Sequence, residues 1–568
     1  MEATINEAEE VKFKKVTKKS KRKYPGFRKN LCDYIQEYTE YTGIHGFKYM
    51  GEQDRSIFEK LWWLVLFCIS LWICISLIID TWKKWETSPV LVSFAKSPTP
   101  VWEIPFPALT ICPETKAKQT KYNFTDAYDR YKYDGNLTDE ELKHLSDSNL
   151  ICDSNIYNDG TATVKLETID HLMKIAPQFP EVFLSCKWTL LNESCYDLFT
   201  PTLTEDGLCY TFNMLDRSEI FREKVAQYKD YMKHGRYSEG WTLEKGYPPD
   251  APKDTFPRRA MSAGSTAGLF LVITAYKQDL DYVCRGPVQG FKVIDVLLHH
   301  PSELPRVNRH YFRAPLNQEV VVSIAPDMMT TSPAIVEYEP HRRQCYFPTE
   351  KHLTFFQYYT QQNCEVECLA NYTLVKCGCV AYHMPREKST PICGPGKLEC
   401  MLEAQKSSLE REVEADMLNY KSVDGKTEES DNCYCLPACT SLSYDAETTQ
   451  VPYSWQKIFE GFRADINEFP GIQMSRLTVF FKEQQFITSE RNELYGLTDF
   501  LANCGGILGL FTGFSFLSIV EIFYFIYLRL VCNVKRHGIH YWSGSKSLIN
   551  DENYVHNLTD FAEILCEF

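Results

Sequence analysis

Apolar residues gather in two continuous runs, one near each end of the chain, with a long mixed segment between them. The first run, Leu61 to Ile79, has 19 residues and no charge. About 20 residues at 1.5 Å each cross the hydrocarbon core of a membrane, so this run predicts a spanning helix. The second run, Phe500 to Leu528, is interrupted only by Glu521 and is long enough to span with a tilt or a break in the helix.

The basic residues next to these runs predict their orientation. Ten lysines and arginines lie between Lys12 and Lys29, and Arg529, Lys535 and Arg536 follow the second run. The positive-inside rule places both ends of the chain in the cytoplasm of a plasma-membrane protein. We therefore expect a cytoplasmic N-terminal tail (1–60), a first membrane helix (61–79), an extracellular domain (80–499), a second membrane helix (500–528) and a cytoplasmic C-terminal tail (529–568).

The long segment between the runs mixes strand and helix patterns, which predicts an α+β domain. The stretches Ala267–Ala275, Glu319–Pro326 and Arg476–Ile487 have the pattern of strands. Leu137–Asp147 and Ser218–His234 have the pattern of helices.

Cysteine indicates where this domain lies. The chain has 22 cysteines, of which 16 fall between Cys112 and Cys439 beside Asn-x-Ser/Thr sequons at Asn123, Asn136, Asn192 and Asn371. Dense cysteine with glycosylation sites implies an oxidising, extracytoplasmic compartment. The competing reading, a zinc protein, lacks its usual CxxC pairs, so we expect no metal site. The disulfide candidates are Cys112, Cys152, Cys186, Cys195, Cys209, Cys284, Cys345, Cys364, Cys368, Cys377, Cys379, Cys393, Cys400, Cys433, Cys435 and Cys439, and their spacing leaves the connectivity open.

Charge and motifs exclude two broad classes of function. A net charge of −14 argues against nucleic acid as a main partner. The chain has no P-loop, HExxH, Gly-x-Ser-x-Gly or dinucleotide-binding fingerprint, so an enzyme or a cofactor is not expected.

The second apolar run has features that a simple anchor does not need. Gly505, Gly509 and Gly513 recur every fourth residue, Ser515 and Ser518 follow, and Glu521 is an isolated carboxylate. A packing face between helices is the simpler explanation of the glycines. The carboxylate and the flexible Gly-Phe-Ser stretch favour a pore wall, in which several copies turn exposed backbone toward a water-filled path.

Four motifs make the chain resemble the epithelial sodium channel/degenerin family, and within it the insect pickpocket branch. They are "GIHGFKYM" before the first run, "FPALTICPE" after it, the pair "CGCVAYHMP" and "CYCLPACTSLSYDAE", and "GFS" in the second run. The resemblance covers roughly Gly43 to Arg529. It implies a disulfide-rich thumb-like region at 345–440 and trimers, or mixed trimers with related subunits, that conduct sodium and are blocked by amiloride.

The resemblance also assigns roles to individual positions. It implies a selectivity filter at Gly513, Phe514 and Ser515, with the acidic residue Glu521 below it. By position it further implies an amiloride contact at Gly509, the degenerin gating position at Ala502 and a gating motif at His45 and Gly46. The chain departs from acid-sensing members at Tyr524, where they have a second acidic residue. From the residues alone, His45-Gly46 is a helix-capping turn beside the membrane.

Three functions remain open at this stage. The leading one is a sodium-selective, amiloride-sensitive channel gated by an extracellular or mechanical stimulus, with sodium as its permeant ion. The others are an obligate subunit of a mixed channel and a non-conducting two-pass surface receptor. No residue in the sequence selects the stimulus.

Overall fold

The computed structural model describes residues 25–549 except 53, 88–89, 153–159, 286–289, 294–299, 308–310, 422–432, 464, 466–468 and 495. The chain divides into two compact units. The first unit is built from both ends of the chain, Met1–Ser88 and Tyr495–Phe568, and the second is Pro89–Leu494.

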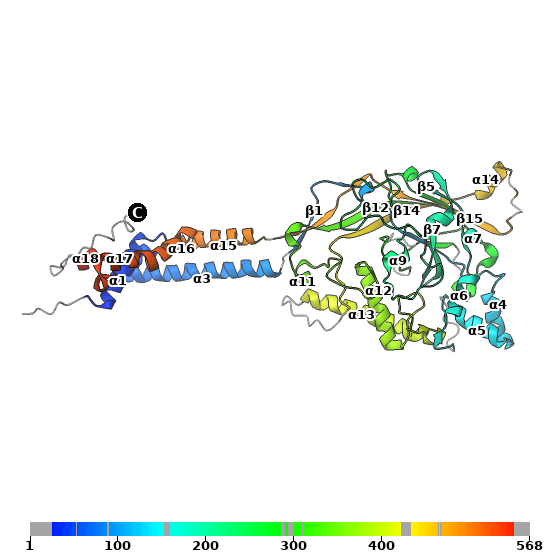
Figure 1. The fold of residues 1–568 in the computed structure, drawn as a ribbon, viewed down its shortest axis with the longest axis horizontal. Helices are drawn as coiled ribbons and strands as arrows, with labels where there is room; N and C mark the ends of the chain where they lie inside the picture. Colours follow the sequence, from blue (N-terminus) through cyan, green and yellow to red (C-terminus); the bar gives the residue numbers. More distant parts are fainter. Residues whose placement is uncertain are drawn as a thin grey trace, which may run out of the picture. The chain divides into compact units, whose positions relative to one another are not determined.

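The first unit is helical (Figure 1). From the N-terminal side come α1 (Phe27–Tyr41), α2 (Phe47–Gly51) and α3 (Ile57–Thr87). From the C-terminal side come α15 (Leu497–Thr512), α16 (Phe516–Phe523), the π-helix η8 (Tyr524–Arg529), α17 (Leu530–His537), η9 (Ile539–Tyr541) and α18 (Lys546–Ile549). The α3 and α15 helices lie side by side, and the rings of Trp82 and Trp85 pack on Phe500 with centroids 5.6 and 5.5 Å away.

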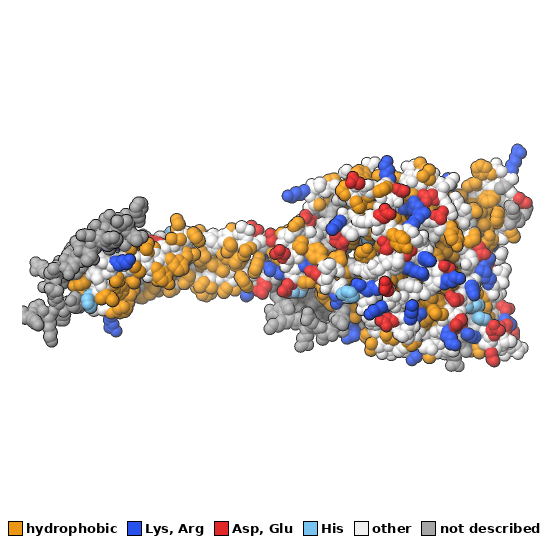
Figure 2. All heavy atoms as spheres, viewed as in Figure 1, with side chains coloured by type: hydrophobic (Ala, Val, Ile, Leu, Met, Phe, Trp, Pro, Cys, Tyr) orange, Lys and Arg blue, Asp and Glu red, His pale blue; other side chains and the backbone are white. Residues whose placement is uncertain are grey.

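Two helical stretches of this unit are long and apolar enough to cross a membrane: Ile57–Glu86 and Phe516–His537. Only 6% of the apolar window of the first and 17% of the second is buried within the chain. The apolar helix of a soluble core would be mostly covered by its own protein, so the low burial of these two helices fits membrane-spanning segments. Figure 2 shows hydrophobic side chains spread over the surface of this unit.

The second predicted membrane helix, 500–528, is not continuous. It divides into α15 and α16 at residues 513–515, and α15 alone is a shorter apolar helix. The break lies within the stretch where the glycine and serine pattern predicted that the helix bends or ends.

The second unit is built on two sheets. The larger one has the order β1-β17-β12-β15-β9-β5-β6, with β14 paired to β12, and the smaller one has the order β11-β10-β3-β8-β7. The strands of the larger sheet are β1 (Val90–Phe94), β5 (Phe183–Trp188), β6 (Leu191–Glu193), β9 (Leu269–Tyr276), β12 (Gln318–Thr331), β14 (Ser441–Pro452), β15 (Ile472–Phe481) and β17 (Ser489–Glu493). Those of the smaller one are β3 (Leu109–Pro113), β7 (Phe199–Thr204), β8 (Gly207–Phe212), β10 (Phe291–Val293) and β11 (Phe312–Ala314).

The core of this unit draws on both sheets. Phe106 is fully buried, and its ring contacts Trp188 and Phe481 from the larger sheet and Phe212 from the smaller one, with centroids 5.0, 5.3 and 6.0 Å away. Edge-on aromatic packing of this kind adds to the free energy gained from burial alone. The two sheets and the helices beside them match the predicted α+β class.

The chain enters and leaves the second unit through neighbouring strands. The antiparallel partners β1 and β17 are in register from Val90–Glu493 to Phe94–Ser489. Residue 90 follows the first apolar helix and residue 493 precedes α15. The two connections are therefore held together by one backbone ladder.

Among the residues that the structure describes, seven disulfides cross-link the second unit. They use fourteen of the sixteen candidates: Cys112–Cys209, Cys152–Cys284, Cys186–Cys195, Cys345–Cys439, Cys364–Cys435, Cys377–Cys400 and Cys379–Cys393. Three of them fix the helix α12 (Gln361–Cys377) or the turn after it, and the bond to Cys400 reaches α13 (Leu398–Lys421). The dense cysteines thus form a braced helical region.

One predicted helix forms and the other is wrong. The first is α5 (Asp139–Ser148), which begins with a capping box between Thr138 and Glu141. The stretch 218–234 contains only the end of α9 (Arg217–Ile220). After it, the backbone N–H groups of Arg222 and Ala226 donate to the carbonyls of Phe355 and Arg386 at 2.9 and 2.8 Å. Pairing with distant segments overrides local helix propensity there.

Candidate functional site

The break in the second apolar run begins with Gly513. This residue has φ 67° and ψ 13°, the left-handed conformation, and its N–H donates to the Gly509 carbonyl at 3.0 Å. A single left-handed residue with this bond is a common helix C-cap, and glycine occupies it without the strain that a Cβ introduces. Gly513 therefore ends α15 at Thr512.

Ser515 begins the next helix. Its backbone is extended, its hydroxyl accepts from the Ser518 N–H at 3.4 Å, and its own N–H donates to the Ser518 hydroxyl at 3.1 Å. This reciprocal cap satisfies two N–H groups that have no partner inside the helix. The two serines that follow the glycines are thus a local helix cap, although Ser515 stays exposed.

The loop before the first apolar helix packs against this break. The His45 N–H donates to the Thr512 carbonyl at 2.9 Å. The His45 ring lies so close to Gly513 that a Cβ there would be 2.8 Å from Cδ2 and Nε2. Gly46, with φ 85°, precedes α2 as its N-cap, so the pair is also the helix-capping turn that its residues suggest. The structure brings His45 to the residue that the resemblance places in the filter.

Ser70 and Thr512 were not identified from the sequence as residues of the break. The Ser70 hydroxyl of α3 donates to the Phe511 carbonyl at 2.7 Å, and the Thr512 carbonyl accepts from His45. Ser70 does have a signal in the sequence, because a hydroxyl inside an uncharged apolar run needs a partner there. Which carbonyl it would meet depends on the pairing of α3 with α15, and the sequence does not contain that information.

The Gly513 and Phe514 carbonyls are different. Within the part of the chain that the structure describes, neither accepts a hydrogen bond. A carbonyl in this apolar region needs a donor, a cation or water. The break therefore leaves two acceptors without a partner in the subunit, beside two carbonyls that α3 and the His45 loop satisfy.

Glu521 lies eight residues after Gly513 on α16. It is half-buried, and its carboxylate accepts from the Gly43 N–H at 3.5 Å. Gly43 belongs to the same loop as His45. The loop thus contacts both the break and the acidic residue that follows it.

The glycine face of α15 is uncovered. No atom lies within 4 Å of a Cβ built on Gly505, Gly506 or Gly509. Ala502, also exposed, is eleven residues before Gly513, roughly 16 Å along the helix. Ala502, the proposed degenerin position, therefore lies away from the proposed filter in the structure. The three glycines are not the face of α15 that packs against α3.

The extracellular candidates lie on the second unit. Asn136, Asn192 and Asn371 are exposed. Asn123 is half-buried and caps the helix α4 (Phe124–Asp129) by accepting from the Asp126 N–H at 3.1 Å. A further sequon, at Asn557, lies outside the described residues.

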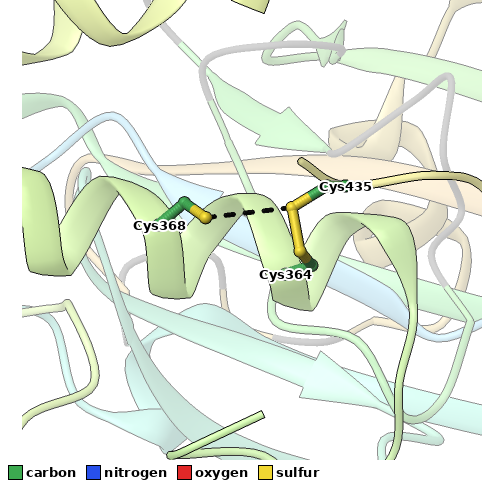
Figure 3. A group of neighbouring side chains, drawn as sticks. All are labelled: Cys364, Cys368 and Cys435. Carbon is green, nitrogen blue, oxygen red and sulfur yellow. Dashed lines mark hydrogen bonds between the residues drawn. A yellow bond between two sulfur atoms is a disulfide. The ribbon is translucent and has the colours of Figure 1, made fainter. Parts of the chain in front are cut away.

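Three sulfur atoms meet on α12 (Figure 3). Cys364 and Cys368 lie one helical turn apart, Cys364 is bonded to Cys435, and the Cys368 sulfur is 3.9 Å from that of Cys435. Zinc binds thiolates, and two of these three sulfurs are in a disulfide. The group is therefore a disulfide with a neighbouring thiol, and it offers a metal only one thiolate.

Comparison with known proteins gives consistent matches. A family model described as amiloride-sensitive sodium channel matches residues 38–525. Over 506 residues the chain is 30% identical to pickpocket protein 28 of Drosophila melanogaster, covering 87% of this chain and 78% of that protein. It is 22% identical to sodium channel protein Nach of Drosophila ananassae over 526 residues, 88% of each chain. It is also 22% identical to acid-sensing ion channel 1A of Danio rerio over 504 residues, 87% of each. The matched residues include the His45 loop and the whole break.

Proposed function

Because this chain belongs to the amiloride-sensitive sodium channel family, which consists of cation channels and not enzymes, we propose that it forms the pore of a sodium-selective, amiloride-sensitive channel. The motifs predicted the family, and the comparisons confirm it. Family members assemble as oligomers of related subunits, and the two apolar helices fit a two-span membrane protein.

The observation that carries this proposal is the pair of unpartnered carbonyls at the break. Gly513 and Phe514 present acceptors in an apolar region, next to a helix face free of side chains at Gly505 and Gly509. One subunit with two spans does not enclose a path. In an oligomer with these faces turned inward, the carbonyls replace part of the hydration shell of sodium, and a ring of Glu521 carboxylates favours cations over anions.

The stimulus is proposed only by class, as an extracellular ligand or mechanical force. The β1–β17 ladder supports this choice, because it joins the chain segments that lead into α3 and α15. An obligate subunit of a mixed channel and a non-conducting receptor are the competing outcomes of the first experiment.

That experiment is current recording from cells that express the chain alone, with and without Ala502→Val. In the family, bulky side chains at this position hold channels open, so the variant should carry an amiloride-blocked sodium current. Silence from a variant that reaches the cell surface contradicts a homomeric channel. Current that appears only with a related subunit identifies the mixed channel, and silence in both cases favours the receptor.

A second experiment tests the filter. Ser515→Cys, in the Ala502→Val background, should change the sodium-to-potassium permeability ratio or make the current sensitive to cadmium, because the exposed Ser515 hydroxyl is replaced by a metal-binding thiol. Cys504→Ser is the matched control, since it removes a native thiol from the same run. An unchanged ratio together with no cadmium block would place Ser515 away from the conduction path.

A further inference from the structure

The segments that flank the two apolar helices fold together. Helix α1 packs on η8 and on the segment 539–548, at the opposite end of the sequence. The contacts run along most of the helix, from Phe27, whose ring centroid lies 5.7 Å from that of Trp542, to Tyr38. Helix α1 and the segment 539–548 lie on the side of the membrane that the positive-inside rule assigns to the cytoplasm, and η8 lies at the end of the second run that faces the same side.

A buried polar group forms the centre of this contact. Asn30, 1% exposed, accepts from the Ser543 hydroxyl at 2.8 Å and donates to the His540 carbonyl at 3.0 Å. The Asn533 side chain donates to the Ser543 carbonyl at 2.9 Å. Buried amides are stable only when such partners are in place, so these bonds specify one alignment of the two segments.

Aromatic rings surround the polar group. Tyr34 packs against Phe525 and Trp542, with centroids 6.0 and 5.6 Å away, and Tyr38 packs against Phe525 at 5.2 Å. The Tyr34 hydroxyl also donates to the Phe525 carbonyl, which lies in a π-helix, where the regular pattern of backbone bonds changes. Burial raises the pKa of Tyr34 to about 12, so this hydroxyl stays a donor throughout the physiological range.

An ion pair joins α1 to the last residue of η8. The Arg529 guanidinium donates to the Glu37 carboxylate at 2.5 Å, and both side chains are partly buried, 35% and 22% exposed. Burial of this degree weakens screening by solvent and salt.

We propose that α1 and residues 525–548 form a lock at the cytoplasmic end of the second span, and that this lock positions His45 on Thr512 and Gly513. Only three residues, 42–44, separate α1 from His45, and one of them, Gly43, is bound to Glu521. Such a short link does not absorb a large displacement of α1. Glu37, Asn30 and Arg529 are therefore positioning residues that act on the break through His45. The lock itself follows from the contacts, whereas its effect on conduction rests on the proposed function.

Cross-linking tests the lock without any current. The Ser547 hydroxyl donates to the Asp33 carboxylate at 3.2 Å, so Asp33→Cys with Ser547→Cys should form a disulfide under mild oxidation. The background is the full chain with Cys32, Cys532 and Cys566 changed to serine and a protease site inserted at residues 96–98, which are exposed and precede Cys112. After cleavage, the two fragments should stay joined on a non-reducing gel and separate on a reducing one.

Ile35→Cys with Ser547→Cys is the matched control. Ile35 is 52% exposed and lies two residues, about 200°, around the helix from Asp33. If the Asp33 pair links no better than the Ile35 pair, the lock is overturned, whatever the chain conducts.

Charge exchange tests the positioning role. In the Ala502→Val background, Glu37→Arg and Arg529→Glu should each change the current per channel at the cell surface by about five-fold, and the double exchange should return it to within about two-fold. Surface biotinylation measures how much of each variant reaches the cell surface, so that the current is compared per channel and misfolded protein is not counted. If the single variants conduct normally, or if the exchange restores nothing, Glu37 and Arg529 do not position His45. If the Ala502→Val parent reaches the cell surface but carries no current, the proposed function is contradicted. The existence of the lock is then tested by the cross-linking experiment alone.

Discussion

Gly513 is under two separate constraints. Its φ of 67° lies in the left-handed region, and the His45 ring occupies the space that a Cβ would need. Either constraint alone favours glycine, and together they make this the least replaceable backbone position of the break. The sequence indicated the position through its small residues, whereas the contact with His45 depends on a loop 468 residues earlier in the chain.

Gly513→Ala should therefore disturb the break. We expect it to shift the permeability ratio or reduce the amiloride-blocked current several-fold, because His45 has to move away and the backbone is strained by roughly 1–3 kcal/mol. Gly461→Ala, in the second unit, is the control, since nothing lies within 4 Å of a Cβ there. Adding His45→Ala to Gly513→Ala should recover part of the loss. Identical behaviour of the two alanine variants in permeability measurements would remove the His45 contact from the mechanism.

Glu303 gives the second unit a pH-dependent stability. Burial raises the pKa of its carboxyl from 4.5 to about 7, and the groups around it are the His300 N–H at 3.4 Å, the Thr360 hydroxyl and the Glu365 carboxylate. Between these two pKa values the folded protein binds more protons at this site than the unfolded chain. The free energy of unfolding therefore falls as pH rises through about 4.5 to 7.

Glu303→Gln should abolish this dependence. At pH 8 the variant should melt higher than the parent by on the order of a few degrees, and at about pH 4, below the unfolded pKa of 4.5, the two should agree. The measurement is thermal unfolding of the purified full-length protein in detergent across this pH range, with the exposed Glu244→Gln as control. A parent and variant with parallel pH profiles would show that Glu303 ionises in the folded protein as it does in water.

At the scale of elements, α12 shows what cysteine spacing predicts and what it does not. Cys364 and Cys368 are four residues apart, a spacing that predicts one face of a helix, and both lie on that face of α12. Cys364 is bonded to Cys435, and Cys368 has Cys433 as its neighbour. The spacing of the cysteines does not predict that residues 433–435 lie against α12. The wrong helix at 218–234 has the same cause, because its backbone pairs with residues 355 and 386.

The Cys368 thiol has Cys433 as its hydrogen-bonding neighbour, and this contact is the main cause that raises its pKa. We expect these two cysteines to form an eighth disulfide in the oxidising compartment, which completes the even set of sixteen. Peptide mapping of the second unit under non-reducing conditions should recover a peptide pair joined by Cys368–Cys433. Recovery of Cys368 joined to Cys435 would instead show exchange with the bond 3.9 Å away.

At the scale of the whole molecule, the sequence predicted the plan of two apolar helices flanking a disulfide-rich α+β domain. This plan was predictable because hydropathy and charge are properties of short stretches of sequence. The packing of α1 on residues 525–548 was not predicted, because its Asn30, Tyr34 and Glu37 form an ordinary polar helix until their partners are known. The filter assignment came from family resemblance, and the structure adds the contacts around it.

The orientation of the chain has its own test. If the second unit is extracellular, Asn136, Asn192 and Asn371, which are exposed, should carry glycans, whereas the sequon at Asn557 should carry none. Single Asn→Gln variants at the first three should each increase mobility on a gel, and Asn557→Gln should not. A glycan at Asn557 would reverse the predicted side of the C-terminal tail.

The β1–β17 ladder has a mechanical consequence. Both tethers of the second unit leave from the same end of one five-pair ribbon, at Val90 and Glu493. A force that acts equally on both connections puts the β1–β17 ribbon under tension without separating its strands. A sideways pull that separates the two connections opens the ribbon one residue pair at a time, beginning with Val90–Glu493. The ribbon thus transmits a force common to both connections and yields stepwise to a force that separates them.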